Sequence, residues 1–490
     1  MERVGRTLLF WGCLGLSLWS LACGDGGSSA PGDFDVPDAP DATEESDSGN
    51  PPPIPEADAG YGDDDLPYPL GSAGPWPLTA VRFFGEPEGL PEDGLADVST
   101  DLAQNVWVAH RQAIYLLRPG STRFERFGPE SGLHIDDAMP PGITALTGGG
   151  LGEVFVGYQG ADITDVQSDP QRFKGKLDRA ILSDGGTLSV AHYDIHNNDA
   201  VGFDENGEVI RLPDGSVDPA YTDWSFHEDR TVLRFLYDHQ FFPGTLYVGF
   251  NHGVARIDAG RPDPIHGFDY ADHVHPDVYD ANGIQRMGDF RALALDPSPR
   301  KTKSGDTQTG MLWMGGRWTA GARLWTPGLW EWTSYAQNPF WLAFSNPPVF
   351  PVAEGDDIYV MGIAALSDGA VFFASGPGNW GFAPLGIARW KDGQFSYFSP
   401  EADLGLPSRA IVDMQRLPDD SILLALEGQG LWRWHPKDPA RANRPERVEG
   451  LTGYDIRRVS VDDRVSPPAV YLVTNRGIAA LRLEDAGKAR

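Results

Sequence analysis

The chain has 490 residues, of which 39 are Lys or Arg and 70 are Asp or Glu, so its formal net charge is −31. A field of that sign repels phosphate backbones, which excludes nucleic acid as an expected partner. Hydrophobic residues make up 41 % of the chain, enough to bury a large core, which excludes a fully disordered protein.

The N-terminus is a basic segment followed by a short apolar run. Arg3 and Arg6 precede Leu8–Leu21, a run of 14 residues. A helix that spans a bilayer needs about 20 apolar residues. The pattern therefore predicts a signal peptide over residues 1–22 rather than a membrane span.

The end of this run resembles the lipobox of bacterial lipoproteins, in which a Cys after a small residue is acylated and becomes the mature N-terminus. Ala22 and Cys23 fit that motif, whereas Ser20 departs from its usual Leu. The resemblance implies lipidation of Cys23 and attachment to a membrane through the lipid. Gly24, where some inner-membrane lipoproteins carry Asp, favours the outer membrane, on its periplasmic or its surface side. Cys13 is the other cysteine of the chain, so no disulfide is expected after cleavage.

Residues 23–75 are predicted to form an extended tether. Positions 24–75 contain 13 acidic residues and no Lys or Arg, and Pro, Gly, Ser and Ala make up most of the remainder. Such a segment cannot bury enough apolar surface to offset the entropy of ordering, and its charges repel one another.

Residues 76–490 contain a repeated pattern. Seven short apolar runs lack alternation, which indicates strands buried on both faces. They are Asn105–His110, Glu153–Tyr158, Thr245–Phe250, Met311–Gly316, Ala370–Ser375, Ser421–Leu426 and Ala469–Thr474. Each run is the second strand of a repeat; a first strand is predicted before it and a third after it. A fourth strand follows more variably, and the clearest examples are Phe124–Phe127, Leu188–Tyr193, Leu329–Tyr335 and Phe395–Phe398.

Four antiparallel strands repeated seven times predict an all-β fold, a seven-bladed β-propeller. A β-sandwich is the alternative, but it would not need seven repeats. The last repeat lacks a good fourth strand, while Leu78–Gly85 resembles a fourth strand placed before the first repeat. We therefore expect this N-terminal strand to complete the last blade, which removes exposed sheet edges. A hairpin is also expected around Val201–Leu212.

The segment Gly405–Trp434 resembles the two-component regulator propeller repeat of periplasmic sensor regions in bacterial hybrid histidine kinases, and Gly89-Leu90-Pro91 fits the start of the same motif. The resemblance covers most of residues 78–485, with the sixth repeat the best match. It implies a periplasmic or surface binding module and names no ligand.

In a propeller, the turns between second and third strands share a face with the loops that lead into each blade, and ligands usually bind there. The side chains expected on that face combine hydrogen-bonding groups with two Trp, which suits a polar ligand with an apolar face. They are His110, Arg111, Tyr158, Gln159, Asn251, His252, Arg317, Trp318, Asn379, Trp380, Glu427, Gln429, Asn475 and Arg476.

Eight of the 11 histidines lie between positions 192 and 275. His192 and His196 are two side-chain pairs apart on one strand, about 13 Å, too far to share an ion. Ordinary surface histidines are the simpler interpretation, and no cofactor is assigned. If a divalent metal such as calcium binds, the candidates are His196, Asp199, His273 and His275.

The pattern favours a non-enzymatic, monomeric lipoprotein at the bacterial cell envelope, in which the propeller binds a small molecule, a glycan or a protein. The alternative is a propeller-fold lyase or hydrolase acting on a polar substrate such as a glycan or lactone. No catalytic residue can be assigned, because catalytic carboxylates in a propeller come from different blades.

Overall fold

The structure is a computed structural model. It describes residues 81–137, 142–160, 175–195, 213, 231–251, 253–258, 272–274, 288–301, 307–317, 320–323, 342–344, 350–351, 358–377 and 383–483. The predicted signal peptide (1–22), the tether (23–75) and the hairpin at 201–212 lie outside these residues. Among the described helices, none is long and apolar enough to cross a membrane.

The described strands form seven four-stranded antiparallel sheets. Sheet 1 contains β2 (Leu95–Thr100), β3 (Val106–His110), β4 (Ala113–Leu117) and β5 (Glu125–Phe127). Sheet 2 contains β6 (Ile143–Gly148), β7 (Glu153–Tyr158), β8 (Gly175–Leu182) and β9 (Leu188–Ile195). Sheet 3 contains β10 (Val232–Asp238), β11 (Thr245–Phe250), β12 (Val254–Asp258) and β13 (Asp272–Val274). Sheet 4 contains β14 (Ala292–Asp296), β17 (Met311–Gly315), β18 (Ala320–Arg323) and β19 (Leu342–Phe344). Sheet 5 contains β20 (Val360–Ala365), β21 (Val371–Ser375), β22 (Gly386–Lys391) and β23 (Gln394–Phe398).

Sheet 6 contains β24 (Ile411–Arg416), β25 (Ile422–Leu426), β26 (Gly430–Trp434) and β27 (Glu446–Arg447). Sheet 7 contains β28 (Ile456–Asp462), β29 (Ala469–Thr474), β30 (Gly477–Arg482) and β1 (Arg82–Phe84). The remaining elements are the hairpin of β15 (Arg300–Lys301) and β16 (Thr307–Gln308) and the short 3-10 helices η2 (Glu86–Glu88), η3 (Pro129–Ser131) and η4 (His134–Asp137).

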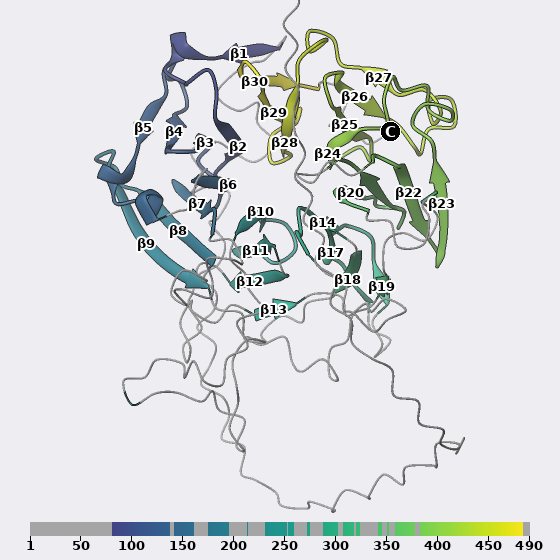
Figure 1. Ribbon diagram of the computed structural model, residues 1–490, viewed down its shortest axis with the longest axis horizontal. Helices are drawn as coiled ribbons and strands as arrows, with labels where there is room; N and C mark the ends of the chain where they lie inside the picture. The colour runs from purple at the N-terminus through teal and green to yellow at the C-terminus, as the bar shows by residue number, and fades with distance from the viewer. Residues whose placement is uncertain are drawn as a thin grey trace, which may run out of the picture. The chain divides into compact units, whose positions relative to one another are not determined.

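The sheets follow one another in chain order around a centre (Figure 1). The first strand of each sheet is innermost; each inner strand contacts the next, and β28 contacts β2. The predicted all-β propeller of four-stranded antiparallel sheets is confirmed. A β-sandwich is excluded, because each sheet packs against a neighbour on both faces.

Burial explains why the second strands lack alternation. All residues of β7, β11, β25 and β29 are buried. An apolar cluster fills each space between consecutive sheets, and a further one joins sheet 7 to sheet 1. Both faces of a second strand therefore lie in a core, and both select apolar side chains.

The N-terminal strand lies in the last sheet. In β1, Arg82 pairs with Ala480 and Phe84 pairs with Ile478 of β30, in antiparallel register. The Phe84 side chain is 3 % exposed and packs edge to face against Phe124, at a centroid distance of 5.9 Å. Phe84 is thereby part of the apolar core that sheet 7 shares with sheet 1.

One predicted outer strand is misplaced. The fourth strand of sheet 4 was expected at Leu329–Tyr335, which lies outside the described residues, but the strand that pairs with β18 is β19. Outer strands have one solvent-facing side and are short, so their sequence pattern is weak. β13 and β27, with three and two residues, were not predicted for the same reason.

Six inner strands carry a β-bulge near their first residue. The register with the second strand shifts at Leu95/Asp97, Ile143/Ala145, Val232/Arg234, Val360/Gly362, Ile411/Asp413 and Ile456/Arg458. A bulge leaves one residue unpaired and increases the local twist. The residue that follows the bulge is therefore at an equivalent place in each strand. In four strands that residue is charged: Asp97, Arg234, Asp413 and Arg458.

The core between sheets 7 and 1 can be tested with two adjacent aromatic residues. We expect Phe84→Ala to lower the free energy of unfolding by about 3–5 kcal/mol, because it leaves a cavity in that core. Phe83, 36 % exposed and stacked on Tyr454 at 4.7 Å, is the matched control. Phe83→Ala should cost about 1 kcal/mol. Urea denaturation followed by Trp fluorescence measures both, and equal losses would contradict the packing described for β1.

Candidate functional site

The turns between second and third strands are fixed to the segments that lead into the inner strands. The backbone N–H of Arg111 donates to the Gly94 carbonyl (3.1 Å), that of Glu427 to Ala410 (3.0 Å), and that of Asn475 to Asp455 (3.0 Å). The two kinds of loop therefore lie side by side, as expected for one face of a propeller. We call this surface the turn face.

Several of the predicted residues are exposed on the turn face. Arg111, Glu427, Asn475 and Arg476 are exposed, and the Arg476 guanidinium lies over the Tyr454 ring at 5.3 Å. Each follows a strand buried on both faces, so a rigid core supports a polar surface. Such preorganised groups lose little entropy when they bind a partner.

His110 is at the edge of this surface and half-buried. Burial lowers the pKa of its imidazole, and Arg111 adds to that effect while Asp93 opposes it. Its Nδ1 accepts a hydrogen bond from the backbone N–H of Gln112 (3.2 Å). At neutral pH the side chain is therefore an uncharged imidazole with its proton on Nε2.

Tyr158 does not lie on the exposed face, contrary to expectation. Its side chain is 1 % exposed, and its hydroxyl donates a hydrogen bond to Asp178 Oδ2. Burial, together with the Asp178 charge, holds the pKa of Tyr158 well above its usual range. At neutral pH the Tyr158 hydroxyl is therefore protonated, and it donates its hydrogen bond to a buried carboxylate within sheet 2.

Four other predicted residues, Asn251, Gln159, Arg317 and Gln429, lie in hydrogen-bonded segments of the backbone or bond to them. Asn251 Oδ1 accepts from the backbone N–H of Thr231 (2.8 Å), and Gln159 Nε2 donates to Thr231 Oγ1 (3.1 Å). Arg317 and Gln429 are half-buried; the Arg317 backbone N–H donates to Gly288 (2.8 Å). The Asn251 and Gln159 side chains therefore hold the neighbouring segment at Thr231 in place.

Other predicted residues lie outside the described part of the chain: His252, Trp318, Asn379 and Trp380 of the turn face, and His196, Asp199 and His275 of the metal candidates. Of His273 only the backbone is described, in β13, where it pairs with Ala255. The proposed metal set therefore stays a prediction, because its side chains lie outside the described part of the chain.

A central cavity of about 140 Å³ lies among the inner strands β2, β6, β10, β24 and β28. Its lining is polar and includes Asp97, Ser99, Arg234, His239 and Arg464. None of the turn-face residues that the structure describes is among the residues that line it, and Glu427 is on an exposed turn. The cavity and the described part of the turn face are therefore lined by different residues.

The charged residues that follow the bulges meet across the centre. Arg234 Nη1 of sheet 3 lies 3.2 Å from Asp413 Oδ2 of sheet 6, and Arg458 Nη2 of sheet 7 donates to the Leu233 carbonyl of sheet 3 (2.9 Å). Burial and the nearby Arg234 lower the pKa of Arg458 to about 10. At neutral pH both arginines are charged, and the two buried carboxylates balance them.

Both carboxylates also connect consecutive sheets. Asp97 of sheet 1 accepts from the backbone N–H of Leu146 in sheet 2 (3.2 Å), and Asp413 accepts from that of Val459 in sheet 7 (2.9 Å). Burial raises the pKa of Asp97, against the opposing effect of Arg458 and Arg234. This network holds the inner strands together and gives the cavity its polar wall.

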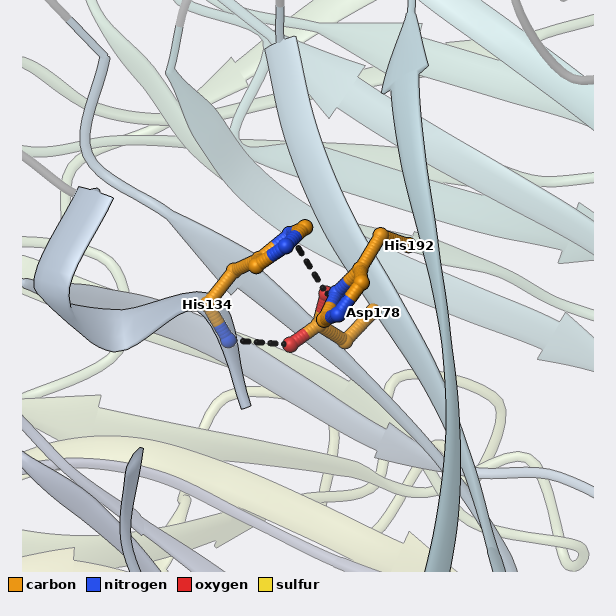
Figure 2. Close-up of side chains that lie close together, drawn as sticks. All are labelled: His134, Asp178 and His192. Carbon is orange, nitrogen blue, oxygen red and sulfur yellow. Dashed lines mark hydrogen bonds and ion pairs between the residues drawn. The ribbon is translucent and has the colours of Figure 1, made fainter. Parts of the chain in front are cut away.

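A second polar cluster, which we call the blade-edge cluster, consists of His134, Asp178 and His192 on η4, β8 and β9 (Figure 2). His192 Nδ1 lies 2.6 Å from Asp178 Oδ1, and His134 Nδ1 lies 3.6 Å from the same oxygen. The His134 backbone N–H donates to Asp178 Oδ2 (2.8 Å). Sequence reasoning missed this cluster, although an acid inside the otherwise buried third strand of a blade is a usable signal.

No family model and no curated protein matches the chain. Among solved structures, it is similar to a streptogramin B lyase (11 % identity over 82 % of this chain and 96 % of that chain, TM-score 0.41). It is also similar to the WD40 propeller domain of Doa1 (10 %, 84 % and 98 %, TM-score 0.41) and to YCF48 from Cyanidioschyzon merolae (12 %, 82 % and 98 %, TM-score 0.43). These similarities concern the fold and identify no ligand or reaction for this chain.

The ion pair across the centre can be tested with a double-mutant cycle. Arg234→Met and Asp413→Leu should each lower the free energy of unfolding by about 3–5 kcal/mol, because each leaves a buried charge without its partner. The double variant should lose much less than the sum. The exposed pair Arg118–Glu125 is the control, with a coupling below about 1 kcal/mol expected. Additive losses for Arg234 and Asp413 in urea denaturation would show that the pair does not act as a unit.

Proposed function

We propose that the chain is a non-enzymatic, ligand- or protein-binding β-propeller lipoprotein, tethered at the bacterial cell envelope. The observation that carries the binding role is the turn face, where Arg111, Glu427 and Arg476 are exposed on short turns that backbone hydrogen bonds fix in place. A rigid, mixed-charge surface is suited to a polar partner such as a glycan or a peptide.

The proposal includes a ring of seven blades in which the N-terminal strand completes the last. The pairing of β1 with β30 and the shared apolar core of sheets 7 and 1 support this closure. In such a molecule the tether leads into a strand of the ring, so β1 fixes the point at which the tether joins the propeller. A lipid on Cys23 and an extended acidic tether would then hold the propeller away from the membrane surface.

The alternative, a lyase or hydrolase, would be favoured by a histidine–carboxylate cluster at the central cavity. The cavity lining contains His239, which pairs with Asp463 (2.9 Å). Among the described residues, however, the group of three such side chains is the blade-edge cluster on η4, β8 and β9, and its residues are not among those that line the cavity. Binding therefore remains the better-supported proposal.

The binding role predicts that three turn-face charges are needed for recognition. We expect the full chain to bind probes on a glycan and peptide array, and the triple variant Arg111→Ala, Glu427→Ala, Arg476→Ala to lose at least tenfold in affinity. A triple variant with the same change of charge elsewhere, Arg123→Ala, Arg444→Ala, Glu449→Ala, is the control, since all three residues are exposed. Absence of binding by the unmodified chain, or equal loss in both variants, would refute the assignment of this face.

The proposed anchor predicts a lipid on one cysteine. Expressed in a bacterial host with radiolabelled palmitate, the chain should carry label and sediment with membranes, and Cys23→Ser should abolish both properties. Cys13→Ser, which changes the other cysteine of the chain, should leave them intact. Label retained in Cys23→Ser would disprove lipidation at this position.

A further inference from the structure

The blade-edge cluster places two imidazoles over a carboxylate that has no exposure to solvent. The Asp178 side chain is 0 % exposed, while those of His134 and His192 are 34 % and 36 % exposed. The two rings stack nearly parallel, 17° apart, and one donor atom from each residue can be chosen so that all three lie within 4.8 Å of one another (Figure 2). The cluster is therefore accessible from one side.

The other blades show that the carboxylate is not needed to build a sheet. Asp178 pairs with Val156 in the middle of β7, and each sheet has a third-strand residue at the same register. In the other six sheets that residue is Tyr115, Ala255, Gly321, Ala388, Trp432 or Ala479. An acid at a position that is otherwise apolar requires a reason specific to sheet 2.

The charge of Asp178 is not balanced by Arg or Lys within the described part of the chain. Its partners there are the Tyr158 hydroxyl, the His134 backbone N–H and the two imidazoles. A buried carboxylate is costly without a cation. The stacked imidazoles repel each other if both are protonated. A divalent cation between them would balance the carboxylate and leave both rings neutral.

We propose that His134, Asp178 and His192 bind one zinc-type transition-metal ion, with a fourth coordination position open to solvent. Two imidazole nitrogens and one carboxylate oxygen are a donor set that suits Zn²⁺. Ligand atoms about 2.1 Å from a tetrahedral ion are about 3.4 Å apart, close to the 2.6 and 3.6 Å that separate the two Nδ1 atoms from Asp178 Oδ1. Because the ring centroids are 2.9 Å apart, the two partly exposed imidazoles must rotate away from each other so that one nitrogen of each ring points at the ion.

The surrounding groups fit this role. The Tyr158 hydroxyl and the His134 backbone N–H both donate to Oδ2 of Asp178, which leaves Oδ1, the oxygen nearest both imidazoles, as the ligand atom. Tyr158 is thus a positioning residue for the carboxylate. Because His134 begins η4 and the other two ligands are on β8 and β9, the ion would also fasten the connection between sheets 1 and 2.

The test is a calorimetric titration of the full chain with ZnCl₂ after treatment with a chelator. We expect one ion per chain in the micromolar range or tighter, and at least a 100-fold weaker affinity for His134→Ala and for His192→Ala. Tyr158→Phe should weaken binding by about 10–100-fold. His239→Ala is the matched control, because His239 also contacts a carboxylate, Asp463 at 2.9 Å, but belongs to no such cluster.

A spectroscopic measurement separates this site from weak binding by acidic residues elsewhere. With Co²⁺ in place of Zn²⁺, the unmodified chain and His239→Ala should give the visible absorption of a tetrahedral site, and His192→Ala should not. Absence of stoichiometric zinc in the unmodified chain, or the same affinity and spectrum in His192→Ala, would overturn the proposal.

Discussion

Burial of every sheet on both faces is the constraint on which the structure depends. A second strand such as β11 or β25 is apolar throughout, so it is stable only when another sheet covers each side. A linear stack would leave its two end sheets half-exposed. Contact of β28 with β2, and the core that Phe84 and Phe124 help to form, cover both ends at once.

The centre of the molecule follows a different rule. Where the inner strands converge, the bulges leave room for long polar side chains, and Arg234, Arg458, Asp97 and Asp413 occupy it as balanced charges. Ion pairs of this kind add less stability than an apolar core, but they are specific in direction and partner. The ion pair of Arg234 with Asp413 and the hydrogen bond from Arg458 to the Leu233 carbonyl join sheet 3 to sheets 6 and 7, which are not its neighbours in the ring.

The sequence was sufficient for the inner three strands of each blade, because short continuous apolar runs such as Glu153–Tyr158, bounded by turn residues, are typical of strands buried on both faces. Outer strands such as β19 were harder to locate, since half of their surface is solvated and their residues obey no strict pattern. Part of the turn face was predicted correctly: Arg111 and Glu427 were expected on turns, and both are exposed there. Tyr158 could not be recognised as buried, because its hydrogen-bond partner Asp178 lies 20 residues later in the sequence. The blade-edge cluster escaped notice as well: Asp178 and His192 become neighbours only through the pairing of β8 with β9, and His134 joins them from η4.

The position of β1 has a consequence for how the molecule is made. Among the described strands, β1 is the first to be synthesised, yet its partner β30 is the last. Contacts between residues so distant in sequence form slowly, and an unpaired strand is prone to wrong associations while it waits. The first of the described strands to be synthesised is thus the one that waits longest for its partner.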